Sequence, residues 1–385
     1  MSRATSRQLR KTFSNLRFKA RVVVAQLPEL FVPGERKVLN LGEIDQDDSE
    51  ELSNCLALVS QLTKYMQWMK AEFMSDNGHC VDYRSLKDST LFGQYTRACR
   101  RLREADLSEL TDAERKAFFL NVYNVLTLHG MVGHARLPSS PLEVRGFWRR
   151  TCYDIGGLVY SLDDIEHGLL RGNRQHSGKV PFKKEDDPRR RFSHTVVDPR
   201  IHFALVCGAK SCPAISVFTA ENVERALDGA TKTYVQQEIS INVYKHIICL
   251  PRIFSWYGQD FGDTKEEIIQ WCSQYMSKQQ LFNLELMNDM CFSSPIEMQF
   301  TDYNWRLNAL PPKQAMDDAE VYRRQRIQRQ STATRPFITS SISAPTSFDE
   351  ESLSSHAACA TSLQSCPQVA EYDADDDFAQ EYVGT

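Results

Sequence analysis

Long apolar runs are absent from this sequence of 385 residues. No stretch approaches the ~18 apolar residues that a membrane-spanning helix needs, and no secretory h-region follows Met1. We therefore expect neither a transmembrane segment nor secretion. The formal net charge of -4 also lacks the excess of basic residues typical of nucleic-acid-binding domains. No nucleic-acid partner is expected.

The common nucleotide-binding and hydrolase motifs are absent as well. The sequence contains no P-loop, no G-x-G-x-x-G, no H-E-x-x-H and no G-x-S-x-G. Nucleotide-dependent enzymes, standard zinc proteases and serine hydrolases are thereby set aside. No cofactor is expected.

Eleven cysteines are present, an odd number in a long chain without a secretion signal. We therefore expect no disulfide framework. We expect a reducing, cytoplasmic location instead. Most of these thiols should be small buried hydrophobic groups, with Cys99 and Cys272 in helical patterns as the clearest cases.

Composition divides the chain into three parts. Residues 1–40 form a basic arm with no acidic residue among the first 21. This arm indicates either contact with anionic lipid or an acidic partner, or mitochondrial targeting as the alternative location. Residues 41–310 have the mixed pattern of a folded α+β domain. Residues 311–385 are Ser/Thr-rich and then acidic, and we expect disorder there because little apolar surface can be buried.

The pattern of residues 41–310 predicts a single compact α+β domain with a central apolar helix and a small sheet. The central helix follows Thr111, whose side chain forms a capping box with Glu114, and it is apolar on almost every side. Gly156-Gly157 predicts a hairpin turn. The other predicted elements are helices at 49–73, 90–103, 162–170, 219–236 and 263–276, and a strand at 246–254.

Residues 198–213 are the most informative segment. Asp198-Pro199 and the apolar residues after them predict a strand, which Gly208 ends. Cys207 and Cys212 then lie close together in a tight loop. Loops that follow strands are frequent locations of functional sites in α/β proteins.

Three segments, 118–124, 161–171 and 202–213, occur in the order found in a known family. Together with 254–261 and 302–308 they resemble the domain of unknown function 547, which is found in bacteria, plants and animals. The resemblance covers about residues 106–308, and Phe119 replaces the usual Trp. It implies no activity. Similar domains follow coiled coils in plants and DEP and glutaredoxin modules in some animal proteins, but this chain shows neither a sustained heptad pattern nor a redox C-x-x-C.

A thiol enzyme needs a cysteine of lowered pKa and a histidine that moves protons. The hypothesis for this chain is Cys207 as the nucleophile and His167 as the general base, with Glu166 orienting the imidazole. Cys212 is the second choice of nucleophile and His202 the alternative base. The predicted substrate-binding residues are Asn121, Asn124, Lys210 and Ser211.

Three interpretations other than a thiol enzyme stay open. The first is the main prediction for the function, a non-catalytic interaction module that binds protein partners, in which both histidines and both asparagines have structural roles; a thiol-dependent hydrolase or acyl-transferase is the alternative to it. The second is zinc bound by His202, Cys207 and Cys212 with His167, although the spacing is only at the edge of the usual range. The third is a labile disulfide between Cys207 and Cys212. The substrate, the partners and the oligomeric state are not determined by the sequence.

Overall fold

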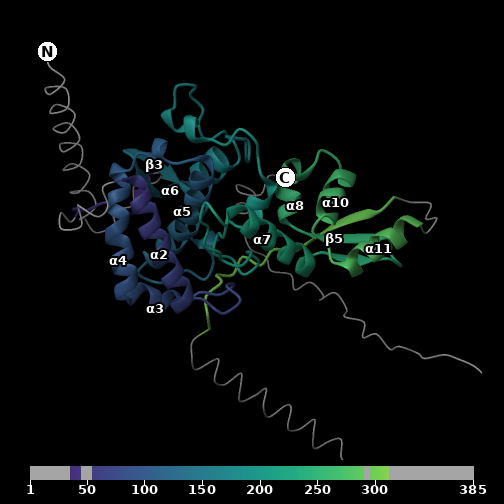
Figure 1. The fold of residues 1–385 in the computed structure, drawn as a ribbon. Helices are drawn as coiled ribbons and strands as arrows, with labels where there is room; N and C mark the ends of the chain where they lie inside the picture. Colours follow the sequence, from purple (N-terminus) through teal and green to yellow (C-terminus); the bar gives the residue numbers. More distant parts are fainter. Residues whose placement is uncertain (1–34, 45–53, 290–294, 312–385) are drawn as a thin grey trace, which may run out of the picture. The chain divides into compact units, whose positions relative to one another are not determined.

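The computed structural model describes residues 35–44, 54–289 and 295–311 (Figure 1). These residues form a mixed α+β structure with helices and two small three-stranded sheets, which confirms the predicted fold class. Most of the predicted basic arm and nearly all of the predicted disordered tail lie outside the described residues. Within the described ranges, no helix is both long and apolar enough to span a membrane.

Three helices open the structure, and each of them begins at a side-chain cap. They are α2 (Cys55–Phe73), α3 (Tyr83–Asp88) and α4 (Thr90–Cys99). The side chains of Asn54, Asp82 and Ser89 accept hydrogen bonds from amides of the first turns, which would otherwise lack acceptors. The short 3₁₀ turns that follow are η1 (Arg100–Glu104) and η2 (Leu107–Glu109).

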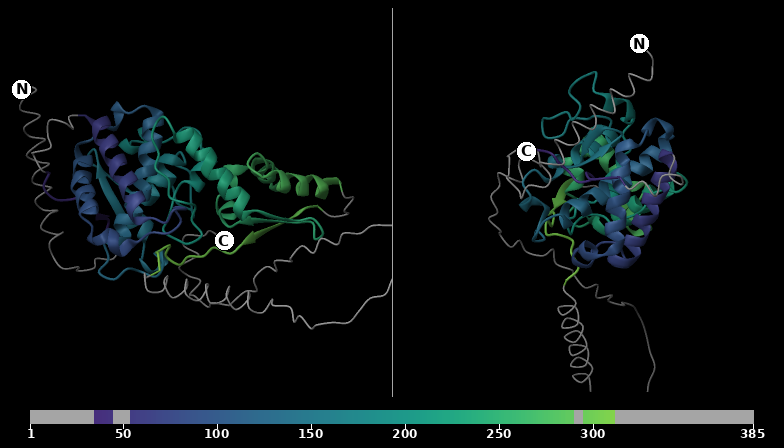
Figure 2. Two further views of the ribbon diagram at one scale, coloured as in Figure 1. Left: turned by 60° about the horizontal axis from the view of Figure 1, so that its bottom comes forward. Right: turned by 90° about the vertical axis from the view of Figure 1, so that its left-hand side faces the viewer.

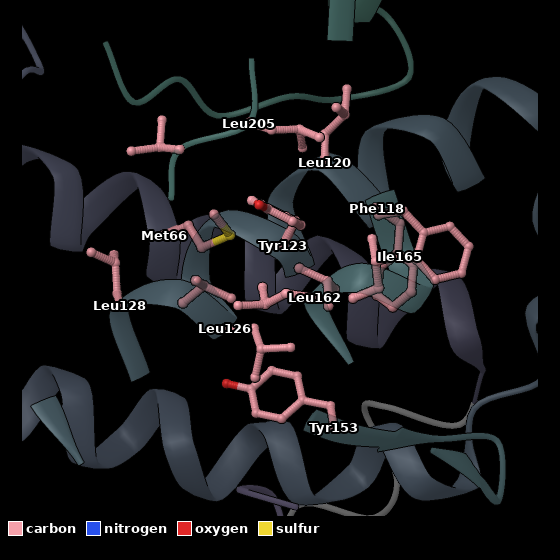
Figure 3. Close-up of a cluster of buried hydrophobic side chains, with 14 of the residues drawn as sticks. Met66, Phe118, Leu120, Tyr123, Leu126, Leu128, Tyr153, Leu162, Ile165 and Leu205 are labelled. Atoms are coloured by element: carbon pink, nitrogen blue, oxygen red, sulfur yellow. The ribbon is translucent and has the colours of Figure 1, made fainter. Parts of the chain in front are cut away.

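The central helix is α5 (Asp112–Val132), and it begins at the predicted capping box of Thr111 and Glu114. Every residue from Ala117 to Leu128 is buried, so the helix is surrounded by other elements, as its apolar pattern predicts. Figure 3 shows Leu126 of α5 between Leu205 and Tyr153, which come from different parts of the chain. Full burial of such a side chain contributes about 1.5–3 kcal/mol to stability.

The first sheet contains the predicted hairpin. Strands β2 (Thr151–Ile155) and β3 (Leu158–Ser161) are antiparallel, and β1 (Lys37–Val38) pairs in parallel with β2. Gly156 and Gly157 have φ values of 60° and 80°, the left-handed conformation that a tight two-residue hairpin turn requires. The short elements before the hairpin are η3 (Pro141–Glu143) and α6 (Phe147–Arg150).

A π-helical turn, η4 (Asp164–Leu170), follows the hairpin. Ser161 and Asp164 cap each other's backbone amides at 3.0 and 3.1 Å. A helical turn thus begins where the helix over 162–170 is predicted, although the helix type differs. Wider π turns redirect successive side chains and are frequent at functional sites. Here Asp163, the residue before the turn, and Glu166 and His167 within it lie in different surroundings, described below.

The predicted strand over 198–206 is wrong. Residues Pro199–Phe203 form a 3₁₀ helix, η6, whose first turn is capped by the carboxylate of Asp198. A short apolar run fits a buried strand and a buried helical turn equally well. The Asp-Pro pair supplies a cap and a first helical residue, and these favour the turn. Another 3₁₀ helix, η5 (Pro188–Phe192), precedes it.

The second sheet has the order β4–β5–β6, with β4 antiparallel and β6 parallel to β5. Helix α11 lies beside this sheet (Figures 1 and 2). In the segment where a helix over 263–276 is predicted, Thr264 and Glu267 form a capping box at the start of a helix. The elements are α7 (Val223–Glu238), β4 (Ser240–Asn242), β5 (Ile247–Pro251), α8 (Ile253–Trp256), α9 (Gly258–Phe261), α10 (Lys265–Ser273), α11 (Lys278–Asp289) and β6 (Glu297–Thr301).

Candidate functional site

Two asparagines of α5 hold the loop that carries the thiols. Asn124 donates to the carbonyl of Ala204 at 2.9 Å and accepts from the amide of Val206 at 2.9 Å. Asn121 makes the same pair of bonds with the backbone of Phe218, at 2.7 and 2.9 Å. The central helix therefore fixes the backbone on both sides of the loop. Neither amide lines the two cavities described below.

Replacing Asn124 with Ala is expected to destabilise the protein. The substitution leaves a buried N–H and a buried C=O without partners, and each such group costs about 1–3 kcal/mol. Chemical denaturation monitored by circular dichroism measures the change. Asn242→Ala is the matched control, since its side chain accepts one bond, from Lys245, at an exposed turn. Equal midpoints for the two variants would contradict this role.

Residues 304–307 lie along the thiol loop and bond to its backbone and to Ser211. Ala209 forms a β-bridge with Leu307, and the amide of Lys210 donates to the carbonyl of Arg306 at 2.8 Å. The hydroxyl of Ser211 accepts a bond from the amide of Asn304 at 2.9 Å. Two of the predicted substrate-binding residues therefore have different surroundings. The hydroxyl of Ser211 is bonded to a backbone amide, whereas the side chain of Lys210 is exposed.

The loop brings the two predicted thiols into contact. The sulfur atoms of Cys207 and Cys212 lie 3.2 Å apart, and the hydroxyl of Tyr303 lies 3.6 Å from the first and 3.2 Å from the second. Burial opposes ionisation of Cys212, but hydrogen bonds from Cys207 and Tyr303 outweigh it and lower its pKa to about 7. The bond to Cys212, together with burial, raises the pKa of Cys207. The pair therefore holds one negative charge readily and resists a second.

Cys207 lines a small cavity of about 50 Å³, which also contains His202 and Glu166. The remaining walls are mainly aromatic, and they include Tyr257 and Tyr303. Cys207 is half-buried whereas Cys212 is buried and does not line the cavity. A molecule in this cavity would therefore meet Cys207 rather than Cys212.

The orientation of His202 is fixed by a buried carboxylate. Its Nε2 lies 2.8 Å from Oδ2 of Asp260, and its ring stacks on Tyr257 with 4.1 Å between the ring centres. Burial raises the pKa of Asp260, but hydrogen bonds from His202 and Arg171 outweigh burial and hold it below the ordinary value. Because an ionised carboxylate only accepts, Nε2 carries a proton, which leaves Nδ1 as the nitrogen that can accept one.

Arg171 completes this buried polar group. Its guanidinium makes two bonds to Asp260, at 2.6 and 3.1 Å, and its central carbon lies 4.8 Å from the ring centre of Tyr257. Both Arg171 and Asp260 are buried. Such a planar, doubly bonded pair fixes the carboxylate in one orientation, and this in turn fixes the imidazole of His202.

His167 lies elsewhere. It lines a separate, larger cavity and accepts at Nδ1 from Arg171 at 3.1 Å. Glu166, its neighbour in η4, is 3.9 Å from that nitrogen and accepts instead from the hydroxyl of Tyr257 at 2.9 Å. The structure thus places Glu166 and His202 with Cys207 in the small cavity, and His167 in the wall of the larger one. The roles given to these residues remain predictions.

Four side chains that shape the site were missed by the sequence analysis: Arg171, Tyr257, Asp260 and Tyr303. A signal for them existed, because Arg171 lies in segment 161–171, and the others lie in segments 254–261 and 302–308, which carry the family resemblance. Their pairing with Cys207 and His202 had no local signature. Among the described residues, no group of three or more His, Cys, Asp or Glu side chains could hold a metal ion. The zinc alternative therefore has no ligand set in this part of the chain.

Comparison with known proteins gives one match. Residues 107–235 match the family described as Protein of unknown function, DUF547. No curated protein and no solved structure matches the chain. The matched residues include α5, the hairpin, η4 and the thiol loop, whereas Tyr257, Asp260 and Tyr303 lie beyond them. The resemblance is confirmed: residues 107–235 of this chain are a domain of the DUF547 family.

Proposed function

We propose that this protein is a thiol-dependent acyl-transferase or hydrolase that reacts at Cys207. One observation carries the proposal: Cys207 and His202 line the same cavity, and Nε2 of His202 is bonded to the buried Asp260. A thiol, an imidazole and a carboxylate that orients the imidazole are the parts of a nucleophilic triad. His202 replaces His167 as the base in this proposal.

The proposed step uses an activated acyl compound, an ester or a thioester. Nδ1 of His202 takes the proton of Cys207, and the thiolate attacks the carbonyl carbon to form a C–S bond. The C–O or C–S bond to the leaving group breaks, and the leaving group takes the proton back from His202. Water or another acceptor then attacks the thioester and releases Cys207. Tyr303 stabilises the thiolate of Cys207 by donating a hydrogen bond to it.

The size of the cavity limits the acyl group. Its volume of about 50 Å³ is roughly the space of one or two water molecules. It suits a short acyl group such as acetyl and is too small for a bulky one unless aromatic side chains move. Small acyl donors are therefore the appropriate first substrates.

The test is acetylation of the native protein by p-nitrophenyl acetate, with the adduct located by mass spectrometry. We expect acetyl transfer to Cys207, its loss in Cys207→Ala, and a rate roughly 10²–10⁴-fold lower in His202→Asn. Cys249→Ala is the control, because this half-buried thiol lies in β5 away from the cavity. Folding of each variant is checked by circular dichroism.

Two results would overturn the proposal. One is acetylation spread evenly over the accessible cysteines. The other is a well-folded His202→Asn variant with unchanged acetylation of Cys207. If p-nitrophenyl acetate modifies neither Cys207 nor Cys212, the non-catalytic interaction module is the better interpretation.

A further inference from the structure

A second cavity, of about 670 Å³, lies apart from the thiols. Its walls come from α6, the end of the hairpin, η4 and the loop over residues 176–183. This volume is within the range of sites that bind small molecules, about 300–1,000 Å³. The proposed acyl transfer does not use it.

The walls of this cavity are strongly basic. Asp163 and Asp164 are its only acidic side chains within the described residues, and Asp164 already pairs with Arg36 at 2.8 Å. Against these two stand six cationic side chains: Arg36, Arg145, Arg149, Arg150, Lys179 and Lys183. Such an excess of one sign attracts an oppositely charged ligand and raises its local concentration.

His167 supplies an independent observation at the same place. The guanidinium of Arg171 can only donate, so Nδ1 of His167, 3.1 Å away, must accept. Burial, with the nearby His176 and Arg171, also lowers the pKa of His167, and the ring is neutral. Its proton is therefore on Nε2.

That Nε2–H is an unused donor. His167 is 3% exposed, and Nε2 has no hydrogen-bond partner among the described residues. Arg171, which donates to Nδ1 of His167, does not line the cavity. His167 itself does line it. A buried donor without an acceptor costs about 1–3 kcal/mol, so native structures rarely leave one unpaired.

Asp163 offers a second buried polar atom in the same wall. Its Oδ1 has no hydrogen-bond partner within the described part of the chain. Burial and the nearby carboxylates of Glu166 and Asp164 raise its pKa to about 7. A carboxyl group of this kind is partly protonated at neutral pH and can donate to an oxygen atom.

We propose that this cavity binds a small polyanion that carries phosphate or carboxylate groups, with Nε2–H of His167 donating to one of its oxygen atoms. The cationic side chains around the cavity neutralise the remaining charge. The proposal is independent of the chemistry at Cys207, because the two cavities share no lining residue.

The test is calorimetric titration of the full chain with pyrophosphate and, separately, with citrate. The two probes distinguish a phosphate ligand from a carboxylate ligand, and binding of either one that depends on the residues below supports the proposal. Affinity should fall as salt is added, because exposed charges are screened. Histidine ¹⁵N spectra should show a shift of the Nε2–H signal of His167 on binding.

Lys183 and Lys184 provide a matched pair of exposed neighbours, of which only Lys183 lines the cavity. Lys183→Gln is expected to weaken binding roughly threefold to tenfold and Lys184→Gln less than twofold. His167→Phe keeps an aromatic ring next to His176 but removes the donor, and it should weaken binding roughly tenfold or more.

The proposal is overturned if neither probe binds, or if Lys183→Gln and Lys184→Gln affect binding equally. It is also overturned if a folded His167→Phe variant binds as well as the parent protein. Because both lysines are exposed, their comparison remains decisive even if His167→Phe fails to fold.

Discussion

Cys207 is expected to be alkylated by iodoacetamide at least roughly a hundredfold faster at pH 7 than the buried thiols of the described region. The reason is the pair that it forms with Cys212, whose pKa is lowered to about 7. The two sulfurs are 3.2 Å apart and share one charge. The lowered pKa belongs to Cys212, but Cys207 is the thiol that lines the cavity. The proton of Cys207 passes to Cys212 along their hydrogen bond as Cys207 reacts, so Cys207 should take the alkyl group, with half-maximal rate near pH 7. Mass spectrometry of the native protein measures each site.

Other cysteines provide the comparison in the same sample. Burial raises the pKa of Cys55 to about 11 and those of Cys99 and Cys152 to about 12. Their alkylation should be negligible at pH 7. Tyr303→Phe removes a donor to the pair and should move the reaction of Cys207 to higher pH. Rates that are alike for Cys207 and Cys99 would show that the pair does not activate the thiol.

The second large effect is expected at Asp260. Asp260→Asn leaves the charge of Arg171 buried without its carboxylate, and losing one partner of a buried ion pair costs roughly 3–5 kcal/mol. The same change disturbs the bond that orients His202. Urea denaturation measures the loss of stability. Asp302→Asn is the control, since Asp302 is 88% exposed and lies 3.8 Å from Arg252, and exposed pairs contribute little.

The contribution of Asp260 should depend on pH in a defined direction. Burial raises its pKa, but the bonds from His202 and Arg171 lower it further, so the folded pKa is below the unfolded one. A depressed carboxyl pKa stabilises the fold above the unfolded pKa, and this contribution is lost as the pH falls toward the folded pKa. The stability difference between the parent protein and Asp260→Asn should therefore shrink in acid. A difference that stays constant as the pH is lowered would contradict this assignment.

Much of the local structure could be predicted from the sequence. The capping box of Thr111 and Glu114, the Gly156-Gly157 turn and the central position of α5 all follow from signals within one or two turns of chain. The strand predicted over 198–206 is wrong, because a short apolar run fits both a strand and a 3₁₀ turn. Both structures bury the same apolar side chains, so the apolar pattern does not distinguish them.

The sequence by itself determined the fold class, the family and the location of the two thiols in one loop. Only the tertiary structure decided which histidine lies with them: His202 shares the cavity of Cys207, and His167 faces another. It also decided which distant residues lie at the candidate site. Asp260 is 58 residues from His202 along the chain, and Tyr303 is 96 residues from Cys207. Local patterns follow from the geometry of neighbouring residues, whereas contacts between distant residues depend on how whole elements pack, and no local periodicity encodes that packing.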